Sequence, residues 1–186
     1  MPNIIGGKYK KTILEVPSKL VRPTAAFKRE AIFSILESYS IKNSIEIYKK
    51  KSIIDIFAGS GLIGLEAISR GIHKSYFIDN NHEVIKVLKK NCQKICHENE
   101  YEIIFSNAID SLDKNFLVEP SIIFIDPPYN KENINLLLVK ILKNKIKTKN
   151  TFVIIETAIN DEITIPKGLS LLKEKIYGKT KILFYY

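Results

Sequence analysis

Short apolar runs alternate with longer amphipathic stretches from residue 51 onward. The apolar runs are SIIDIF, SYFID, YEIIF, SIIFID and TFVIIE, and each has the length of a strand. Between them, apolar positions that recur every three or four residues predict helices over 61–70, 81–97, 108–114 and 131–145. Strands that alternate with helices predict a mostly parallel sheet with right-handed connections.

The C-terminal stretch LSLLKEKIYGKTKILFYY predicts two further strands, joined by a tight turn at Gly178 and Lys179. We therefore expect an α/β fold, a doubly wound, Rossmann-like sheet of seven mostly parallel strands with the last strand antiparallel. In such a sheet the ligand lies beyond the carboxyl ends of the strands, where the strand order reverses.

The beginning of the chain does not share this pattern. Residues 1–22 show no clear period and carry two adjacent glycines and several lysines, which predicts a basic arm that can form a short hairpin. The following RPTAAFKREAIFSILES predicts a helix with Thr24 as its cap. We divide the chain into this arm and a single domain over residues 23–186.

Composition narrows the class of protein. The 186 residues are 45% hydrophobic and 26% charged, as in an ordinary globular domain. No apolar run approaches the roughly 20 residues of a membrane helix, and no signal peptide is visible, so a cytoplasmic protein without a membrane partner is expected. The net charge of +9 suits a polyanionic partner.

Arginine is rare in this chain. Only Arg22, Arg29 and Arg70 stand among the 29 basic residues. Because lysine serves elsewhere, these three positions are candidates for a planar, bidentate donor.

The stretch DIFAGSGLIG contains a literal G-x-G-x-x-G, with Asp79 twenty positions after Gly59. By that pattern alone the ligand is a dinucleotide. Asp55, just before the loop, argues against a pyrophosphate, because like charges repel. A ligand with a cationic amino group, such as S-adenosylmethionine, suits it better. The alternative is that Asp55 only anchors the loop backbone.

Polar residues also end the later strands. Asp79 is placed to accept hydrogen bonds from ribose hydroxyls. Asn107, with the N–H of Ala108 beside it, can bind an adenine edge or cap a helix. In DPPYN, the prolines leave carbonyls free beside the Asp126 carboxylate, and Tyr129 offers a ring for stacking. These groups match an exocyclic amino group of a base.

The motifs DIFAGSG and DPPY resemble those of class I S-adenosylmethionine-dependent methyltransferases that modify exocyclic amino groups. IIGGKYKK, RPTAAFKREAIFSIL, DIFAGSGLIGLEAISRG, SNA, FIDPPY and VIIE follow the order found in the bacterial RsmD family. The resemblance covers nearly the whole chain. Two departures are the lysines after the glycine pair, where the family is usually arginine-rich, and Asp79, where it often has Glu.

The resemblance implies transfer of a methyl group to N2 of a guanine, of the guanine 966 type, in 16S ribosomal RNA of the small ribosomal subunit. The implied catalytic residues are Asp126, Pro127, Pro128 and Tyr129. The cofactor residues are Asp55, Phe57, Ala58, Gly59, Ser60, Gly61, Asp79, Asn80, Asn107, Ala108 and Asp126. The expected RNA-binding residues are Lys8, Lys10, Lys11, Arg22, Thr24 and Arg29.

Other classes remain open. The same machinery can methylate another RNA, DNA adenine or a protein glutamine. An NAD-dependent oxidoreductase is disfavoured by Asp55, and a non-catalytic RNA-binding protein by the intact Asp126 and glycine loop. The two cysteines and three histidines lack zinc-ligand spacing, so we expect no metal. The chain is expected to act as a monomer.

Overall fold

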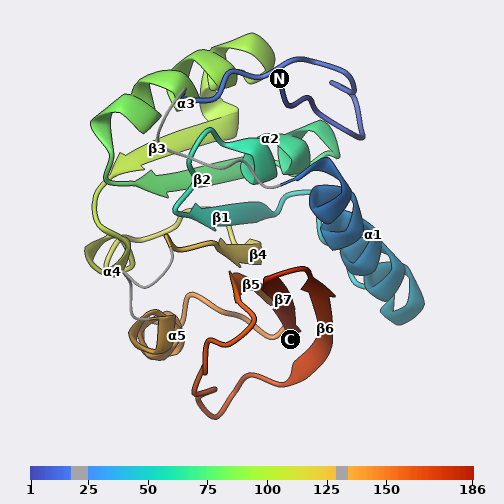
Figure 1. Cartoon of the computed structure of the whole chain (residues 1–186), viewed down its shortest axis with the longest axis vertical. Coiled ribbons are helices and arrows are strands. Elements are labelled where there is room, and N and C mark those ends of the chain that lie inside the picture. The colour runs from blue at the N-terminus through green and yellow to red at the C-terminus, as the bar shows by residue number, and fades with distance from the viewer. Residues whose placement is uncertain (18–24, 129–133) are drawn as a thin grey trace.

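The computed structural model describes residues 1–17, 25–128 and 134–186. The predictions made for Arg22, Thr24 and Tyr129 therefore lie outside the described residues. Seven strands form one sheet with the order β3-β2-β1-β4-β5-β7-β6 (Figure 1). The strands are β1 (Ser52–Ile56), β2 (Lys74–Asp79), β3 (Tyr101–Phe105), β4 (Pro120–Ile125), β5 (Phe152–Ala158), β6 (Leu171–Tyr177) and β7 (Thr180–Tyr185).

The first five strands are parallel, and β7 runs antiparallel to both of its neighbours. This confirms the predicted doubly wound sheet, the antiparallel last strand and the closing hairpin. The order reverses between β1 and β4, because the chain first builds outward to β3 and then returns to the other side of β1. The predicted ligand crevice lies at this reversal.

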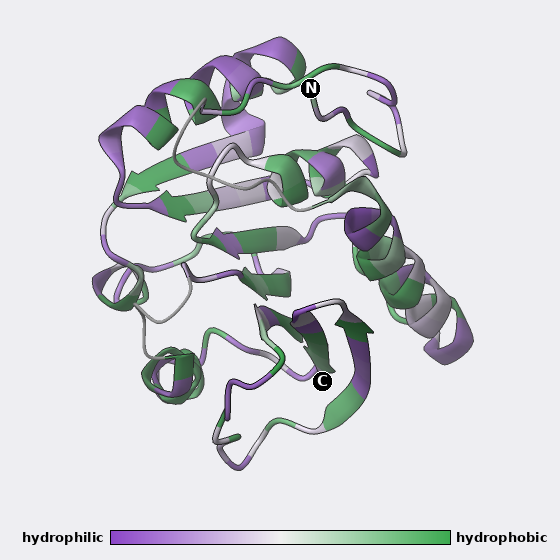
Figure 2. Cartoon of the chain, in the orientation of Figure 1, coloured by the Kyte–Doolittle hydropathy of each residue, from purple (hydrophilic) through white to green (hydrophobic). Residues whose placement is uncertain are grey.

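Helices cover both faces of the sheet. They are α1 (Ala26–Asn43), α2 (Leu62–Ser69), α3 (His82–Ile95), α4 (Ala108–Ser111) and α5 (Ile134–Lys143), with a 3₁₀ turn at Glu98–Glu100. One hydrophobic cluster joins α1, α2, α3 and the N-terminal arm to the sheet, and a second joins α4 and α5 to the opposite face. The central strands β1 and β4 are buried on both faces, which explains why their sequences do not alternate (Figure 2).

The N-terminal arm forms the expected hairpin, with an antiparallel bridge between Asn3 and Ile13. The arm also belongs to the main core, because Ile4 and Leu14 are fully buried in the hydrophobic cluster that includes α1, α2 and α3. The hairpin lies beside the end of α2 in Figure 1. It is therefore packed on the domain rather than extended from it.

Backbone groups of the arm bind the buried carboxylate of Glu66 on α2. The N–H groups of Ile5 and Gly6 donate to its two oxygens, each at 2.8 Å. Arg70 donates to the same carboxylate at 2.9 Å and to Glu37 at 2.9 Å. Glu66 is fully buried, so its charge is neutralised and hydrogen-bonded inside the protein as physical chemistry requires.

Gly7 has a φ of +74° and lies against the end of α2. A Cβ added there would be 1.8 Å from the carbonyl oxygen of Ser69. The neighbouring N–H of Lys8 donates to that same oxygen at 2.7 Å. Only glycine fits this close approach of two backbones.

Within the described residues, no helix combines the length and the apolar character needed to cross a membrane.

Candidate active site

Register places four carboxylates along one edge of the sheet. The pairs Ile56–Ile78, Ile56–Ile125 and Ile125–Ile155 align the strand ends of β2, β1, β4 and β5. Asp79 ends β2, Asp126 follows β4 directly, and Glu156 lies near the carboxyl end of β5, while Asp55 is inside β1. Side chains alternate between the two faces of a sheet, and these four positions are each two residues from a core residue that packs with α1, α2 and α3. The four carboxylates therefore lie on that face.

The glycine loop connects β1 to α2 and has an unusual backbone. Phe57 has a φ of +65°, which is rare for a large residue, and Gly59 and Gly61 have φ values of +56° and +81°. A Cβ at Gly61 would meet Leu88 Cδ1 at 2.4 Å. Gly61 thus brings the beginning of α2 close to α3, and it caps α2 without a side-chain hydrogen bond. Strained backbone of this kind concentrates at ligand sites.

Asp55 anchors the helix that follows the loop. Its side chain is 2% exposed, and Oδ2 accepts the N–H of Gly64 at 3.1 Å. Burial raises the pKa of this carboxyl well above its usual value, the Gly64 N–H opposes that shift, and the nearby Asp126 and Asp79 add to it. Asp55 thus anchors the loop backbone, and no cationic group among the described residues contributes to the shift of its pKa.

Asp79 closes the loop from the neighbouring strand. Its Oδ2 accepts the N–H of Gly59 at 3.0 Å, and its Oδ1 accepts the N–H of Asn81 at 2.9 Å. Asn80 is exposed beside it. Each carboxylate oxygen has a second acceptor site, so these bonds fix Asp79 while leaving it able to bind hydroxyl groups.

Asn107 is the cap of α4. Its Oδ1 accepts the N–H of Asp110 at 2.8 Å, and its Nδ2 donates to the Asp110 carboxylate. The sequence left two roles open for this side chain, and the structure shows the capping role. Ala108 is buried at the first position of the same helix. An adenine edge can therefore meet the backbone of this turn more readily than the Asn107 amide.

The chain leaves β4 at Asp126, whose N–H donates to the Ile56 carbonyl at 3.4 Å. Asp126 and Pro127 are half-buried, and Pro128 is exposed. The described part of DPPY, Asp126 to Pro128, thus follows β4 at the carboxyl end of the strand, next to the end of β1. Tyr129, expected to stack on the base, is not among the described residues.

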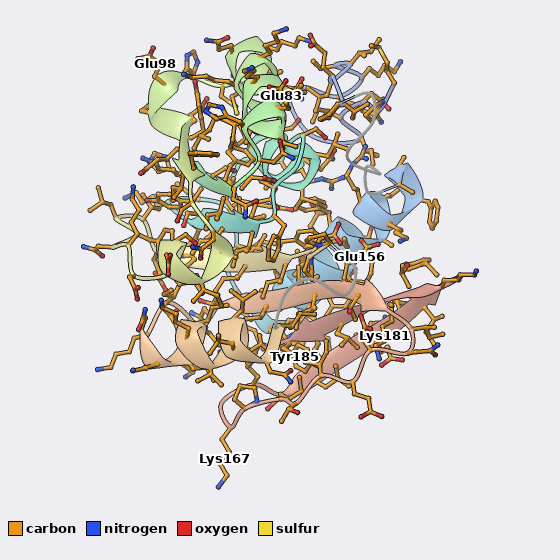
Figure 3. The ribbon with its side chains drawn as sticks, turned by 60° about the vertical axis from the view of Figure 1, so that its left-hand side comes forward. Glu83, Glu98, Glu156, Lys167, Lys181 and Tyr185 are labelled. Carbon is orange, nitrogen blue, oxygen red and sulfur yellow. The ribbon has the colours of Figure 1, made fainter. Side chains whose placement is uncertain are left out.

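One polar cluster was not identified as part of the site from the sequence. Glu156 is 6% exposed and forms an ion pair with Lys28 of α1. Lys28 also donates to Thr180 Oγ1 of β7 at 2.7 Å. Figure 3 shows Glu156 where β5 passes under α1. The available signal was a lone acidic residue at the end of TFVIIE, which the sequence analysis used as a predicted strand and as part of a family motif, but not as a source of a site residue.

The proposed RNA-binding residues divide into two groups. Lys8, Lys10 and Lys11 are exposed at the turn of the hairpin and can contact a polyanion. Arg29 is 1% exposed, and its Nη2 donates to the carbonyl of Asn3 at 2.6 Å. The prediction that Arg29 contacts RNA is wrong: its rarity reflects a buried donor that secures the arm. The described residues contain no group of side chains arranged to hold a metal ion.

Comparison with known proteins addresses the class of enzyme. The sequence model of the family described as conserved hypothetical protein 95 matches residues 2–186. The ribosomal RNA small subunit methyltransferase D of Buchnera aphidicola from Acyrthosiphon pisum is 38% identical over 169 residues, covering 89% of this chain and 82% of that protein. This chain belongs to the RsmD family of ribosomal RNA small subunit methyltransferases.

Two proteins of Escherichia coli support the same family. The methyltransferase D of strain K12 is 30% identical over 188 residues, covering 98% of this chain and 88% of the relative. The solved protein yhhF, which carries a provisional description as a methyltransferase, superimposes with a TM-score of 0.83 at 28% identity and covers 99% of this chain and 96% of its own. The RsmD fold is thus shared from the arm to the closing hairpin.

Proposed function

We propose that this protein transfers the methyl group of S-adenosylmethionine to the exocyclic N2 of a guanine in 16S ribosomal RNA, at the position of guanine 966. The observation that carries the proposal is the juxtaposition of the glycine loop and Asp126 across β1 and β4. The proposed partner is the small ribosomal subunit, and the proposed compartment is the cytoplasm, where that subunit is assembled.

The residues present suit the cofactor. The edge formed by Asp55, Asp79 and Asp126 is acidic, and burial together with the other two carboxylates raises the pKa of Asp55. A ligand with an amino group, a sulfonium and ribose hydroxyls supplies positive charge and donors to such an edge. A pyrophosphate would add negative charge instead. This contrast supports S-adenosylmethionine over NAD.

Each residue has a proposed part in holding the cofactor. Asp55 and the strained loop around Phe57 lie nearest the amino-acid end, Asp79 accepts the ribose hydroxyls, and the backbone at Ala108 receives the adenine. When bound, S-adenosylmethionine supplies an electrophilic methyl group on sulfur. The protein's own task is to hold the acceptor nitrogen in line with that group.

The guanine amino group is a weak nucleophile because its lone pair is delocalised into the ring. Hydrogen bonds from its N–H groups to Asp126 and to the Pro127 carbonyl favour a more tetrahedral nitrogen with its lone pair directed outward. The carboxylate also stabilises the positive charge that develops on nitrogen as the bond forms. After transfer, the amino proton leaves toward Asp126 or water.

A labelled-methyl assay on small subunits that lack the modification tests the function. We expect label in 16S RNA and N2-methylguanosine on nucleoside mass spectrometry. Labelled protein, DNA or N6-methyladenosine in parallel reactions would instead support the alternative acceptors. Calorimetry with S-adenosylmethionine and with NAD separates a methyltransferase from an oxidoreductase, and we expect heat only from the former.

A further inference from the structure

Lys28, Glu156 and Asp126 follow one another along the edge of the sheet. Asp126 follows β4, and Glu156 lies in β5 one residue beyond the Ile125–Ile155 pair, so the two are neighbours across adjacent strands, which lie about 4.8 Å apart. Lys28 bridges Glu156 to Thr180, whose strand β7 lies on the side of β5 away from β4. From β4 toward β7, the charged groups therefore follow in the order Asp126 carboxylate, Glu156 carboxylate and Lys28 ammonium.

Glu156 is incompletely satisfied. One of its oxygens, Oε1, accepts a hydrogen bond from the Lys28 ammonium, whereas the buried Oε2 has no hydrogen-bond partner among the described residues. A buried carboxylate oxygen without a donor costs free energy, so such a group requires an explanation. At the carboxyl end of a central strand, beside the proposed acceptor residue Asp126, the explanation that fits is a donor that arrives with the substrate.

The Watson–Crick edge of guanine offers a matching series of groups. It carries the N2 amino donor, then the N1–H donor, then the O6 acceptor, and flipped bases are read by hydrogen bonds along this edge. We propose that Glu156 accepts the guanine N1–H and that Lys28 donates to O6, so that this pair selects guanine while Asp126 holds the N2 amino group. The inference rests on the proposed function and names the specificity residues of the same site.

Adenine fails the same test at each position. Its N1 is an acceptor facing the Glu156 carboxylate, and its 6-amino group is a donor facing the Lys28 ammonium. An acceptor would face an acceptor at Glu156, and a donor would face a donor at Lys28, so buried polar groups would stay unpaired. The side chains of Lys28 and Glu156 are only 14% and 7% exposed, so binding of the base at these residues requires a local rearrangement that uncovers them.

The test uses 2-aminopurine, which keeps the amino group at C2 but has an N1 acceptor and no O6. The target guanine in an RNA substrate is replaced by 2-aminopurine through splinted ligation, and kcat/KM is measured on both substrates. We expect the wild type to prefer guanine by about 10- to 100-fold. Glu156→Gln, whose amide can donate to N1, should lower the rate on guanine and reduce the preference to within a few-fold of unity.

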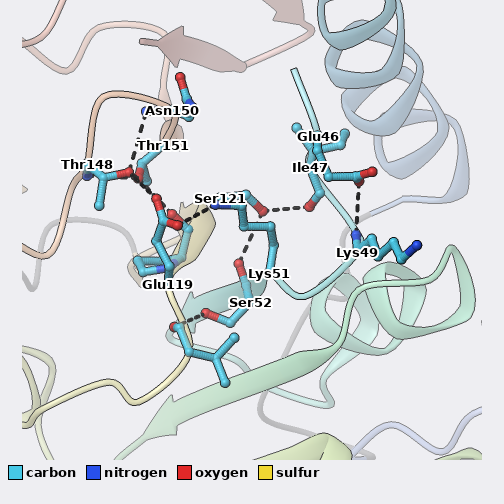
Figure 4. Close-up of polar contacts among 12 residues, drawn as sticks. Glu46, Ile47, Lys49, Lys51, Ser52, Glu119, Ser121, Thr148, Asn150 and Thr151 are labelled. Carbon is cyan, nitrogen blue, oxygen red and sulfur yellow. Dashed lines mark hydrogen bonds and ion pairs between the residues drawn. The ribbon is translucent and has the colours of Figure 1, made fainter. Parts of the chain in front are cut away.

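Glu119→Gln is the matched control. Glu119 also pairs with a lysine, Lys51, but at the opposite edge of the sheet, where β1 and β4 begin (Figure 4). This variant should keep the wild-type preference. An unchanged preference in a folded Glu156→Gln protein overturns the specificity role, while continued methylation of guanine leaves the proposed function standing. If the wild type methylates no guanine, the proposed function itself fails.

Discussion

The carboxylate of Asp55 accepts a hydrogen bond from the N–H of Gly64 at 3.1 Å, inside the protein and at the beginning of α2. This single bond joins the first strand to the helix that carries the glycine loop. It does not compensate for the burial of the carboxylate, whose pKa stays raised. Burial of this carboxylate therefore costs stability at neutral pH, and the proposed binding of a cationic ligand gives a reason for that cost.

Asp55→Asn should therefore stabilise the protein without cofactor at neutral pH. Because the folded-state pKa is raised above the unfolded value of 3.8, the stabilisation from protonated Asp55 is fully present below that value and is lost as pH rises through the folded-state pKa. The variant removes this loss. Thermal melts should show a higher Tm than the wild type at pH 7, by about 2–4 °C for each kcal/mol of added stability. The two proteins should converge near pH 4.

The same carboxylate should make cofactor binding release protons. A cationic amino group beside Asp55 favours its ionised form and lowers its pKa, so the affinity for S-adenosylmethionine should rise with pH until the pKa of free Asp55 is passed. Calorimetry in two buffers of different ionisation enthalpy measures the released protons. Equal apparent enthalpies in both buffers would contradict this, and Asp55→Asn should abolish any difference.

Asp126→Ala should reduce kcat for methyl transfer by about 100- to 1000-fold, because the amino group loses the carboxylate that orients it and stabilises its developing charge. Binding of S-adenosylmethionine should persist in calorimetry. Asp113→Ala is the control, since Asp113 is exposed and pairs with Lys140 and Asn144, away from the proposed site. Normal turnover in Asp126→Ala would refute its catalytic assignment.

Glu66→Ala should detach the N-terminal hairpin. The change leaves two arm N–H groups and Arg70 without their buried acceptor, so urea unfolding should show a loss of about 3–5 kcal/mol. The hairpin should also become sensitive to proteolysis before the sheet does. Glu83→Ala, which breaks an exposed ion pair with Lys86, should leave the unfolding free energy essentially unchanged. Equal effects of the two changes would argue against the anchoring role.

Replacing Lys8, Lys10 and Lys11 together with glutamine should weaken RNA binding and reduce its salt dependence. Removing one lysine–phosphate pair reduces the magnitude of the slope of log K against log salt concentration by roughly 0.7–0.9, so removing all three predicts a change of about 2–3. The comparison is the triple change of the exposed Lys143, Lys145 and Lys149, which removes the same charge near the end of α5. If the two triple variants bind RNA with the same affinity and the same salt dependence, the hairpin lysines do not contact the RNA specifically.

Much of the fold could be predicted because the buried strands are apolar throughout and the helices between them are amphipathic. The alternation alone required parallel crossovers, and the observed β1 to β5 follow it. The helix boundaries were less predictable. The stretch 108–114 predicted a longer helix than the observed Ala108–Ser111, since Asn107 caps only a single turn before the chain turns toward β4.

The arrangement of the candidate site residues was predictable where they are close in sequence. Asp55 lies near the end of β1, Gly59 and Gly61 lie in the loop that follows it, and Asp79 ends the next strand, where its carboxylate binds that loop. Arg29 was misassigned because its partner, the Asn3 carbonyl, is 26 residues away and reaches it only once the arm has folded back. A rare arginine indicates a contact that needs several hydrogen-bond donors, but the sequence does not identify the partner that accepts them.

The roles of Glu156 and Glu66 were also not predicted from the sequence, because their partners are distant along the chain. Each is an acidic residue within an apolar segment, a pattern that signals a buried partner without naming it. Their partners come from α1 and from the arm, more than 50 residues earlier in the chain. Such contacts depend on tertiary packing, which periodicity does not encode.

Helix α2 leaves the glycine loop at one end and meets the hairpin at the other, where Gly7 lies against Ser69. Its eight residues span about 12 Å. Because the hairpin is fixed to this short helix, the proposed function requires a set distance between the RNA at the hairpin lysines and the nucleotide that is methylated. A folded RNA surface meets that demand more readily than a flexible strand, so geometry as well as base identity can limit where the methyl group is delivered.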